Sequence, residues 1–125
     1  MVITGDGELL MGLGSLATIA AEAPRNIAIL VVDNERYGET GMQASHTARG
    51  VDLSAMAAAA GFAHAETIRT RRELDGWIPR AYEERGPLLA VVKVSSEPVP
   101  IVVPPRDGTL LKHRFRAHVL GSGAL

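Results

Sequence analysis

The first motif along the chain combines residues that suit a phosphate and a metal ion. Gly5-Asp6-Gly7 follows a short apolar start and opens a helical run. A helix that begins at a glycine turn directs its unpaired N–H groups and the positive end of its dipole toward that turn, which favours a phosphate. Because the carboxylate of Asp6 would repel a phosphate, the motif indicates a divalent cation between the two.

A second motif, Asp33-Asn34, follows a nearly continuous apolar run over residues 26–32. Such a run is typical of a parallel strand that is buried on both faces. Neighbouring parallel strands bring their carboxyl ends to the same edge of a sheet, so Asp6 and Asn34 can meet although 27 residues separate them. Their carboxylate and amide oxygens, with a nearby backbone carbonyl, form an all-oxygen set that suits magnesium or calcium better than zinc.

Helical and extended patterns alternate along the chain and must position these motifs. Helices are expected over residues 8–23, 53–60, 70–84 and 110–120, and strands over residues 1–4, 26–32, 62–68 and 87–94. This alternation predicts an α/β fold with an open, mostly parallel, doubly wound sheet and helices on both faces. The chain is expected to form a single domain over residues 1–125, since this length suffices for one core and not for two.

Two segments between these elements are expected to be irregular. Residues 35–50 are polar, glycine-rich and long for a mere connection, which indicates a functional loop beside the metal turn. Residues 95–107 hold four prolines and are expected to be extended. The last helix is expected to dock on the domain while its basic side chains face solvent, through the apolar stripe formed by Leu111, Phe115 and Val119.

The composition is that of an ordinary globular domain. Hydrophobic residues make up 46% and charged residues 22%, and a net charge of −1 gives no bulk attraction to nucleic acid or anionic membranes. The absence of cysteine excludes disulfides, thiolate metal sites and cysteine nucleophiles, and it is compatible with the reducing cytoplasm, where we expect the protein. We expect neither a secretion signal nor a membrane span, because no apolar run approaches about 18 residues.

The same motifs carry a family resemblance that covers nearly the whole chain. Gly5-Asp6-Gly7, followed after 25 residues by Asp33-Asn34, resembles the binding motif of thiamine diphosphate-dependent enzymes. Residues 37–43, Tyr-Gly-Glu-Thr-Gly-Met-Gln, resemble a Tyr-x-x-Thr-Gly-Gly-Gln stretch of phosphonopyruvate and sulfopyruvate decarboxylases and of 2-oxoacid:ferredoxin oxidoreductases. Residues 51–53 and 112–116 fit the decarboxylase branch better. Met42 stands where that pattern has its second glycine, so the substrate side is expected to differ.

The resemblance implies that this chain is the diphosphate-binding domain of such an enzyme. The implied cofactor-binding residues lie on the glycine turn, at the end of the second strand and in the loop: Gly5, Asp6, Gly7, Glu8, Leu9, Asn34, Arg36, Tyr37, Gly38 and Thr40. Among these, magnesium would be bound by the carboxylate of Asp6, the side-chain oxygen of Asn34 and the backbone carbonyl of Arg36. The N–H groups of Gly7, Glu8 and Leu9 would meet the diphosphate.

The resemblance also implies the reaction, the decarboxylation of a 2-oxo acid, with the thiazolium ring of the cofactor as electron acceptor. In this family a glutamate on a separate pyrimidine domain activates the cofactor, and no segment of this chain resembles that domain. We therefore expect a pyrimidine-domain partner and no activity of the chain alone. No catalytic residue is assigned here, because a single histidine in a polar loop, His46, is more often incidental.

Two other interpretations are kept open at this stage. Family members have roughly another fifty residues upstream in this domain, so the chain is expected to be truncated at its N-terminus, and a non-catalytic remnant or interaction module would retain the fold without the cofactor. A nucleotide-binding domain is less consistent, since the turn lacks a P-loop lysine and a Gly-x-Gly-x-x-Gly pattern. Apolar strands with too few helices to cover them favour a homo- or hetero-oligomer that uses the Gly-Asp-Gly edge or residues 8–23 as interface.

Overall fold

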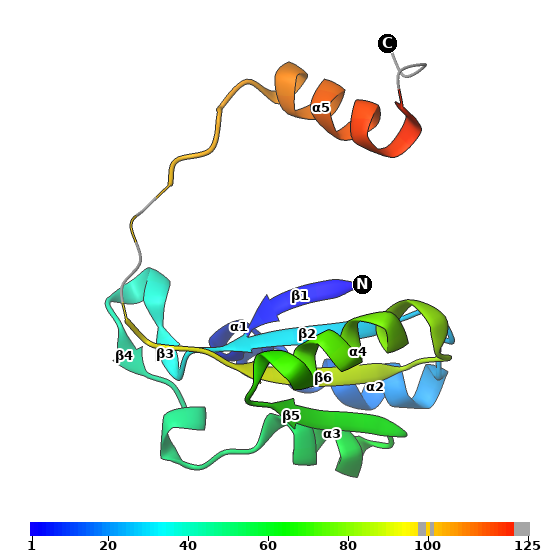
Figure 1. The fold of residues 1–125 in the computed structure, drawn as a ribbon. Coiled ribbons are helices and arrows are strands. Elements are labelled where there is room, and N and C mark those ends of the chain that lie inside the picture. The colour runs from blue at the N-terminus through cyan, green and yellow to red at the C-terminus, as the bar shows by residue number, and fades with distance from the viewer. Residues whose placement is uncertain (98–99, 101, 122–125) are drawn as a thin grey trace.

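The structure is a computed structural model that describes residues 1–97, 100 and 102–121. Its centre is a four-stranded sheet in the order β1-β2-β6-β5, and its strand pairs are all parallel. The strands are β1 (Val2–Gly5), β2 (Ala28–Asp33), β6 (Leu88–Lys93) and β5 (His64–Ile68). Figure 1 shows the open parallel sheet, which confirms the prediction from the sequence.

Helices cover both faces of this sheet, as the doubly wound pattern predicts. One face carries α1 (Asp6–Met11), α2 (Ser15–Glu22) and α3 (Leu53–Ala60), and the other carries α4 (Arg71–Glu83). Successive residues of β2 point to opposite layers, because Ile29 and Val31 pack with the first group of helices and Ala28 packs with α4. Burial on both faces is the reason that β2 is apolar along nearly its whole length.

Local capping signals explain why α3 and α4 begin where the sequence predicts. The carboxylate of Asp52 accepts the N–H of Ala55 at 3.0 Å and the hydroxyl of Ser54 at 2.7 Å, and these hydrogen bonds lower the pKa of Asp52. At the start of α4, the Thr70 hydroxyl accepts the N–H of Glu73, whose carboxylate accepts the N–H of Thr70 at 2.9 Å. This reciprocal pair satisfies two N–H groups that the helix cannot bond internally.

The prediction of a single helix over residues 8–23 is wrong. The structure has two helices there, α1 and α2, separated by residues 12–14. The N–H of Gly12 bonds the carbonyl of Leu9 at 3.0 Å, which closes α1 with a tight turn, and the N–H of Ser15 bonds the carbonyl of Gly12 at 2.9 Å. Glycine favours the helical conformation less than alanine by about 1 kcal/mol. Two glycines in one turn therefore end the helix despite the apolar periodicity that continues through it.

The loop expected over residues 35–50 contains more regular structure than its sequence indicates. β3 (Arg36–Tyr37) and β4 (Gln43–Ala44) form an antiparallel hairpin, and short 3₁₀ helices follow each strand, η1 (Gly38–Thr40) and η2 (Thr47–Arg49). The turn of the hairpin needs left-handed backbone at Gly41, with φ 115°, and at Met42, with φ 62°. Strands of two residues show no alternation that a sequence pattern can detect, which is why this hairpin was not predicted.

The last helix, α5 (Gly108–Leu120), confirms the prediction of a helix near the C-terminus. The prediction that this helix docks on the domain is wrong. None of its residues is buried, and Figure 1 shows α5 standing apart from the sheet and its helices. The apolar stripe is exposed, with Phe115 at 69% and Val119 at 58%.

The described part of the segment 95–107 is free of helix and strand as predicted, whereas the prediction for Pro98 lies outside the described residues. Of the helices in these described ranges, none is long and apolar enough to cross a membrane.

This arrangement predicts that stability comes from the sheet and its two layers and not from α5. Leu89→Ala is expected to cost about 2–5 kcal/mol, because Leu89 is 0% exposed near the start of β6, an inner strand of the sheet. Phe115→Ala, the matched change on α5, is expected to cost less than about 0.5 kcal/mol. Urea unfolding followed by circular dichroism measures both values. A cost for Phe115→Ala as large as that for Leu89→Ala would contradict the exposed position of α5.

Candidate functional site

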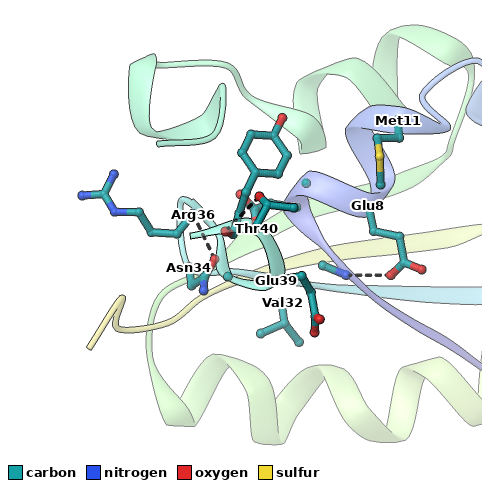
Figure 2. Close-up of a pocket in the computed structure, with 12 residues that line it drawn as sticks. Glu8, Met11, Val32, Asn34, Arg36, Glu39 and Thr40 are labelled. Atoms are coloured by element: carbon teal, nitrogen blue, oxygen red, sulfur yellow. Dashed lines mark hydrogen bonds between the residues drawn. The ribbon is translucent and has the colours of Figure 1, made fainter. Parts of the chain in front are cut away.

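A cavity of about 670 Å³ opens where β1 and β2 end (Figure 2). It is lined by the glycine turn, the end of β2 and the start of the hairpin: Gly5, Asp6, Gly7, Glu8, Met11, Val32, Asn34, Arg36, Tyr37, Gly38, Glu39 and Thr40. This lining includes every residue that the sequence assigns to cofactor binding except Leu9, whose side chain is buried in the core. The structure thus brings together residues that lie more than thirty positions apart along the chain.

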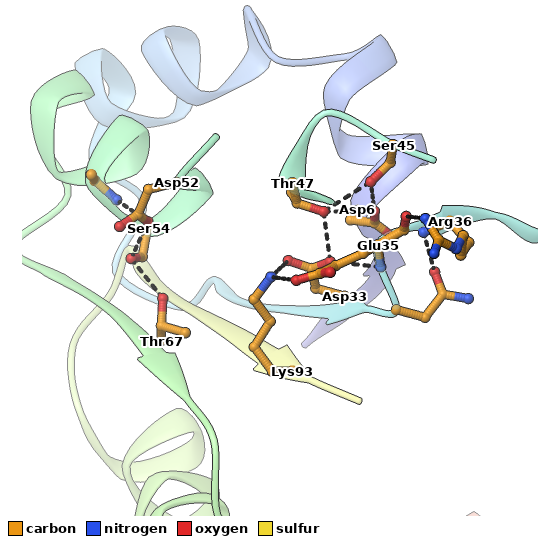
Figure 3. A network of polar contacts seen from close by, with 12 residues as sticks. Asp6, Asp33, Glu35, Arg36, Ser45, Thr47, Asp52, Ser54, Thr67 and Lys93 are labelled. Atoms are coloured by element: carbon orange, nitrogen blue, oxygen red, sulfur yellow. Dashed lines mark hydrogen bonds and ion pairs between the residues drawn. The ribbon is translucent and has the colours of Figure 1, made fainter. Parts of the chain in front are cut away.

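The carboxylate of Asp6 is buried at this cavity and has no cationic partner. Asp6 is the first residue of α1 and is 2% exposed. Its Oδ2 atom accepts the hydroxyl of Ser45 at 2.5 Å and lies 3.1 Å from the hydroxyl of Thr47, as Figure 3 shows. Among the described residues, no donor contacts Oδ1, and no lysine or arginine pairs with Asp6. A buried charge without a partner is costly, so this position favours a bound cation.

Two further oxygens at the cavity remain available for a cation. The Oδ1 atom of Asn34 accepts the N–H of Arg36 at 3.0 Å, which fixes the amide and leaves it a second lone pair. The N–H of Ser45 bonds the carbonyl of Glu35, so the next pair of the hairpin, Arg36 with Ala44, is of the non-hydrogen-bonded kind. The carbonyl of Arg36 is therefore free of the β3–β4 ladder.

This donor set fits magnesium held jointly by the protein and a diphosphate. It offers a carboxylate, an amide oxygen and a backbone carbonyl, all of them hard oxygen ligands. Within the described residues, no group of three His, Cys, Asp or Glu side chains could hold a metal ion by itself. Magnesium commonly takes one or two carboxylates and completes its octahedron with phosphate oxygens and water, so this sparse set suits that ion with a phosphorylated ligand.

The glycines of the turn have two different physical causes. A Cβ atom built on Gly7 would lie 2.6 Å from ring atoms of Tyr37, so the ring can lie against α1 only because position 7 has no side chain. Gly5 has an ordinary extended backbone, with φ −88°, and a Cβ there would meet no atom of the chain within 4 Å. No described atom close to this position requires glycine, and Gly5 lies in the lining of the cavity.

Glu8 closes the start of α1 from the outside. Its Oε2 atom accepts the hydroxyl of Thr4 at 2.7 Å and the N–H of Gly5 at 3.4 Å, and these hydrogen bonds lower the pKa of Glu8. Figure 2 shows the carboxylate folded back on the turn. One N–H at the turn is thus satisfied by the chain itself. The next N–H groups of the helix start are the ones that remain for a ligand.

A polar network that the sequence analysis missed supports the site from behind. Lys93 Nζ lies 2.9 Å from Oδ2 of Asp33 and 2.7 Å from Oε1 of Glu35. Burial by itself would lower the pKa of Lys93, but its hydrogen bonds to Glu35 and Asp33 outweigh this effect and the pKa is raised. Thr47 joins this pair to Asp6, because its hydroxyl lies 2.8 Å from Oδ1 of Asp33.

The Lys93–Asp33 pair of this network could have been predicted from the sequence, whereas the burial of Ser45 and Thr47 could not. Lys93 ends an apolar strand, and parallel pairing of β2 with β6 places it opposite Asp33, so a charge pair at the ends of adjacent strands was predictable. Ser45 and Thr47 lie in a polar segment without periodicity, and only the fold reveals that they are buried. His46 between them is exposed, and its Nδ1 lies 3.3 Å from the Tyr37 hydroxyl, outside the cavity lining.

Comparison with known proteins identifies the relatives of this chain. Residues 1–92 match the family described as thiamine pyrophosphate enzyme, C-terminal TPP binding domain. Over 120 residues the chain is 34% identical to the sulfopyruvate decarboxylase subunit beta of Methanocaldococcus jannaschii. This match covers 92% of this chain and 61% of that protein. Over 89 residues it is 40% identical to the phosphonopyruvate decarboxylase of Streptomyces viridochromogenes. This match covers 71% of this chain and 22% of that protein.

A solved structure gives the same relationship. A Mycobacterium smegmatis protein described as a thiamin diphosphate-dependent enzyme matches 79% of this chain and 18% of its own length, with a TM-score of 0.55 and 25% identity. The chain spans about three fifths of the length of the beta subunit from Methanocaldococcus jannaschii. The expected fold is therefore shared with relatives that are longer than this chain.

The two causes of glycine at the turn predict different effects of the same substitution. Gly7→Ala is expected to cost about 1–3 kcal/mol, because the new methyl group overlaps the ring of Tyr37 and forces it to move. Gly5→Ala, the matched control, is expected to cost less than about 1 kcal/mol, since alanine is only a weaker helix cap there. Denaturant unfolding of the ligand-free protein measures both. Equal costs would show that the close approach of Tyr37 to α1 is not what requires Gly7.

Proposed function

The chain belongs to the C-terminal TPP-binding domain family of thiamine pyrophosphate enzymes, and we propose that it binds thiamine diphosphate and magnesium as a subunit or domain of a 2-oxo acid decarboxylase. The observation that carries this proposal is the buried carboxylate of Asp6, which faces a cavity without a cation of its own among the described residues. The names of the relatives, sulfopyruvate and phosphonopyruvate decarboxylase, support a substrate of the phosphono- or sulfo-substituted pyruvate class.

In this proposal the chain binds and orients the cofactor. The Asp6 carboxylate, the Asn34 amide oxygen and the Arg36 carbonyl would hold magnesium, and magnesium would offset the charge of the diphosphate. Gly5 would leave room for the diphosphate, and the N–H groups at the start of α1 would donate to it. When bound, the cofactor supplies the electron sink for loss of carbon dioxide.

The remaining residues of the lining shape the space beyond the diphosphate. Tyr37, Gly38 and Thr40 line the cavity and would border the thiazolium and the substrate, and Met11 and Val32 add apolar side chains to the lining. Apolar wall excludes water, which strengthens electrostatic interactions inside the site. The left-handed backbone at Met42 retains the conformation that a glycine would adopt, so the departure at this position changes the side chain more than the path of the hairpin.

Activity requires a partner in this proposal. The beta-subunit names of the relatives support a second, different subunit. The partner contributes the pyrimidine-binding half of the site and completes a homo- or hetero-oligomer. A cytoplasmic location remains an expectation of the same proposal.

Cofactor binding is tested by titration calorimetry with thiamine diphosphate, with and without magnesium. The wild-type chain is expected to bind only when magnesium is present. Asp6→Asn is expected to abolish this binding and to leave the ligand-free protein as stable as the wild type or more stable, because an uncompensated buried charge is removed. Asp75→Asn on the exposed face of α4 is the control and should bind normally. Failure of the wild type to bind would favour a non-catalytic interaction module instead.

The need for a partner is tested by decarboxylation of sulfopyruvate and phosphonopyruvate. The chain with cofactor and magnesium is expected to be inactive alone and to become active when a pyrimidine-domain subunit is added, because the activating glutamate lies there. Carbon dioxide release measured by a coupled assay reports both states. Turnover by the purified chain alone would contradict the requirement for a partner, whereas the binding experiment would be unaffected.

A further inference from the structure

Two buried carboxylates meet behind the cavity and share one hydroxyl group. Asp6 is 2% exposed and Asp33 is 1% exposed. The hydroxyl oxygen of Thr47 lies 3.1 Å from Oδ2 of Asp6 and 2.8 Å from Oδ1 of Asp33, as Figure 3 shows. Like charges repel strongly where water is excluded, so the groups between them decide where each carboxylate points.

The available protons do not suffice for every contact in this cluster. Ser45 lies 2.5 Å from Oδ2 of Asp6 and 2.8 Å from the hydroxyl of Thr47. Each hydroxyl has one proton to donate. The short contact assigns the proton of Ser45 to Oδ2 of Asp6, and the single proton of Thr47 lies between Oδ1 of Asp33 and Oδ2 of Asp6, so the two carboxylates share it.

The two carboxylates are consequently held to different degrees. Asp33 accepts from Thr47, from the N–H of Glu35 at 3.0 Å and from Lys93 at 2.9 Å, so both of its oxygens are engaged. Asp6 accepts through Oδ2 only, and its Oδ1 has no donor within the described chain. The anchored Asp33 thus fixes Thr47, and Thr47 together with Ser45 fixes Oδ2 of Asp6 and leaves Oδ1 without a donor among the described residues.

We propose that Thr47 is a positioning residue that presents the free oxygen of Asp6 to magnesium, with Ser45 as its second support and the Lys93–Asp33 pair as its anchor. This inference rests on the proposed function, because it concerns the metal of the same site. Thr47 contacts neither the cavity nor a bound ligand, since it does not line the site. It acts through Asp6, as groups behind a metal ligand commonly do.

The test compares two substitutions at position 47 that differ in the hydroxyl group. Thr47→Val keeps the shape of the side chain and removes the hydroxyl, whereas Thr47→Ser keeps the hydroxyl and removes the methyl group. Magnesium is titrated into each protein at a fixed thiamine diphosphate concentration, and the heat of binding gives the apparent magnesium affinity. Thr47→Val is expected to weaken that affinity about 10–100-fold, while Thr47→Ser stays near the wild type.

A positioning role and a folding role give different results in this experiment. If Thr47 positions Asp6, raising the magnesium concentration restores full binding to Thr47→Val, and the ligand-free variant keeps the circular dichroism spectrum of the wild type and a cooperative thermal transition. Ser45→Ala provides a second folded variant, for which the same weakening of magnesium affinity is expected because Ser45 bonds the same oxygen.

Each other outcome overturns the inference. Magnesium affinity of Thr47→Val and Ser45→Ala equal to the wild type would show that Asp6 needs no such support. A loss that magnesium cannot restore, or one that Thr47→Ser shares, would show a structural role only. Absence of magnesium-dependent binding in the wild type would remove the proposed function and this inference together. Magnesium-dependent binding in the wild type with unaffected variants would remove this inference alone, so the two failures are distinguishable.

Discussion

The structure depends on one electrostatic constraint, the burial of two carboxylates at the ends of neighbouring strands. Asp33 is balanced by Lys93, which the parallel pairing of β2 with β6 places opposite it. Asp6 is balanced by no cation in the described chain, and it directly follows β1 in the lining of the cavity. The described chain supplies a cation for the first charge and none for the second, and the proposed metal site rests on this difference.

The segment between β2 and α3 is organised by this constraint. The hairpin brings Arg36 and Tyr37 to the cavity, and the following turn returns Ser45 and Thr47 beneath it. Residues 35–50 therefore contribute to both sides of the Asp6 carboxylate. A segment of this kind needs few contacts with the hydrophobic core, because hydrogen bonds to buried charges are stronger than those between neutral groups.

What the sequence predicted correctly rests on local signals. The apolar run before Asp33 predicts a buried strand, the capping residues Asp52 and Thr70 predict where helices begin, and the glycine turn predicts the position of Asp6. The break between α1 and α2 was missed because the apolar period continues across the glycines. Ser45, Thr47 and the exposed position of α5 were missed because each depends on which distant segments meet, and no local pattern contains that information.

The exposed helix α5 also separates electric charge within the molecule. It carries Lys112, Arg114 and Arg116 and no acidic residue, while residues 1–107 hold ten basic and fourteen acidic side chains. Because α5 stands apart from the sheet, the chain has a dipole moment, with its positive end at α5 and its negative end at the rest of the chain. Counter-ions screen such a field within roughly 8 Å at physiological ionic strength. At physiological ionic strength this field therefore orients an approaching molecule only just before contact. In buffer of lower ionic strength the screening is weaker, and the field acts over longer distances.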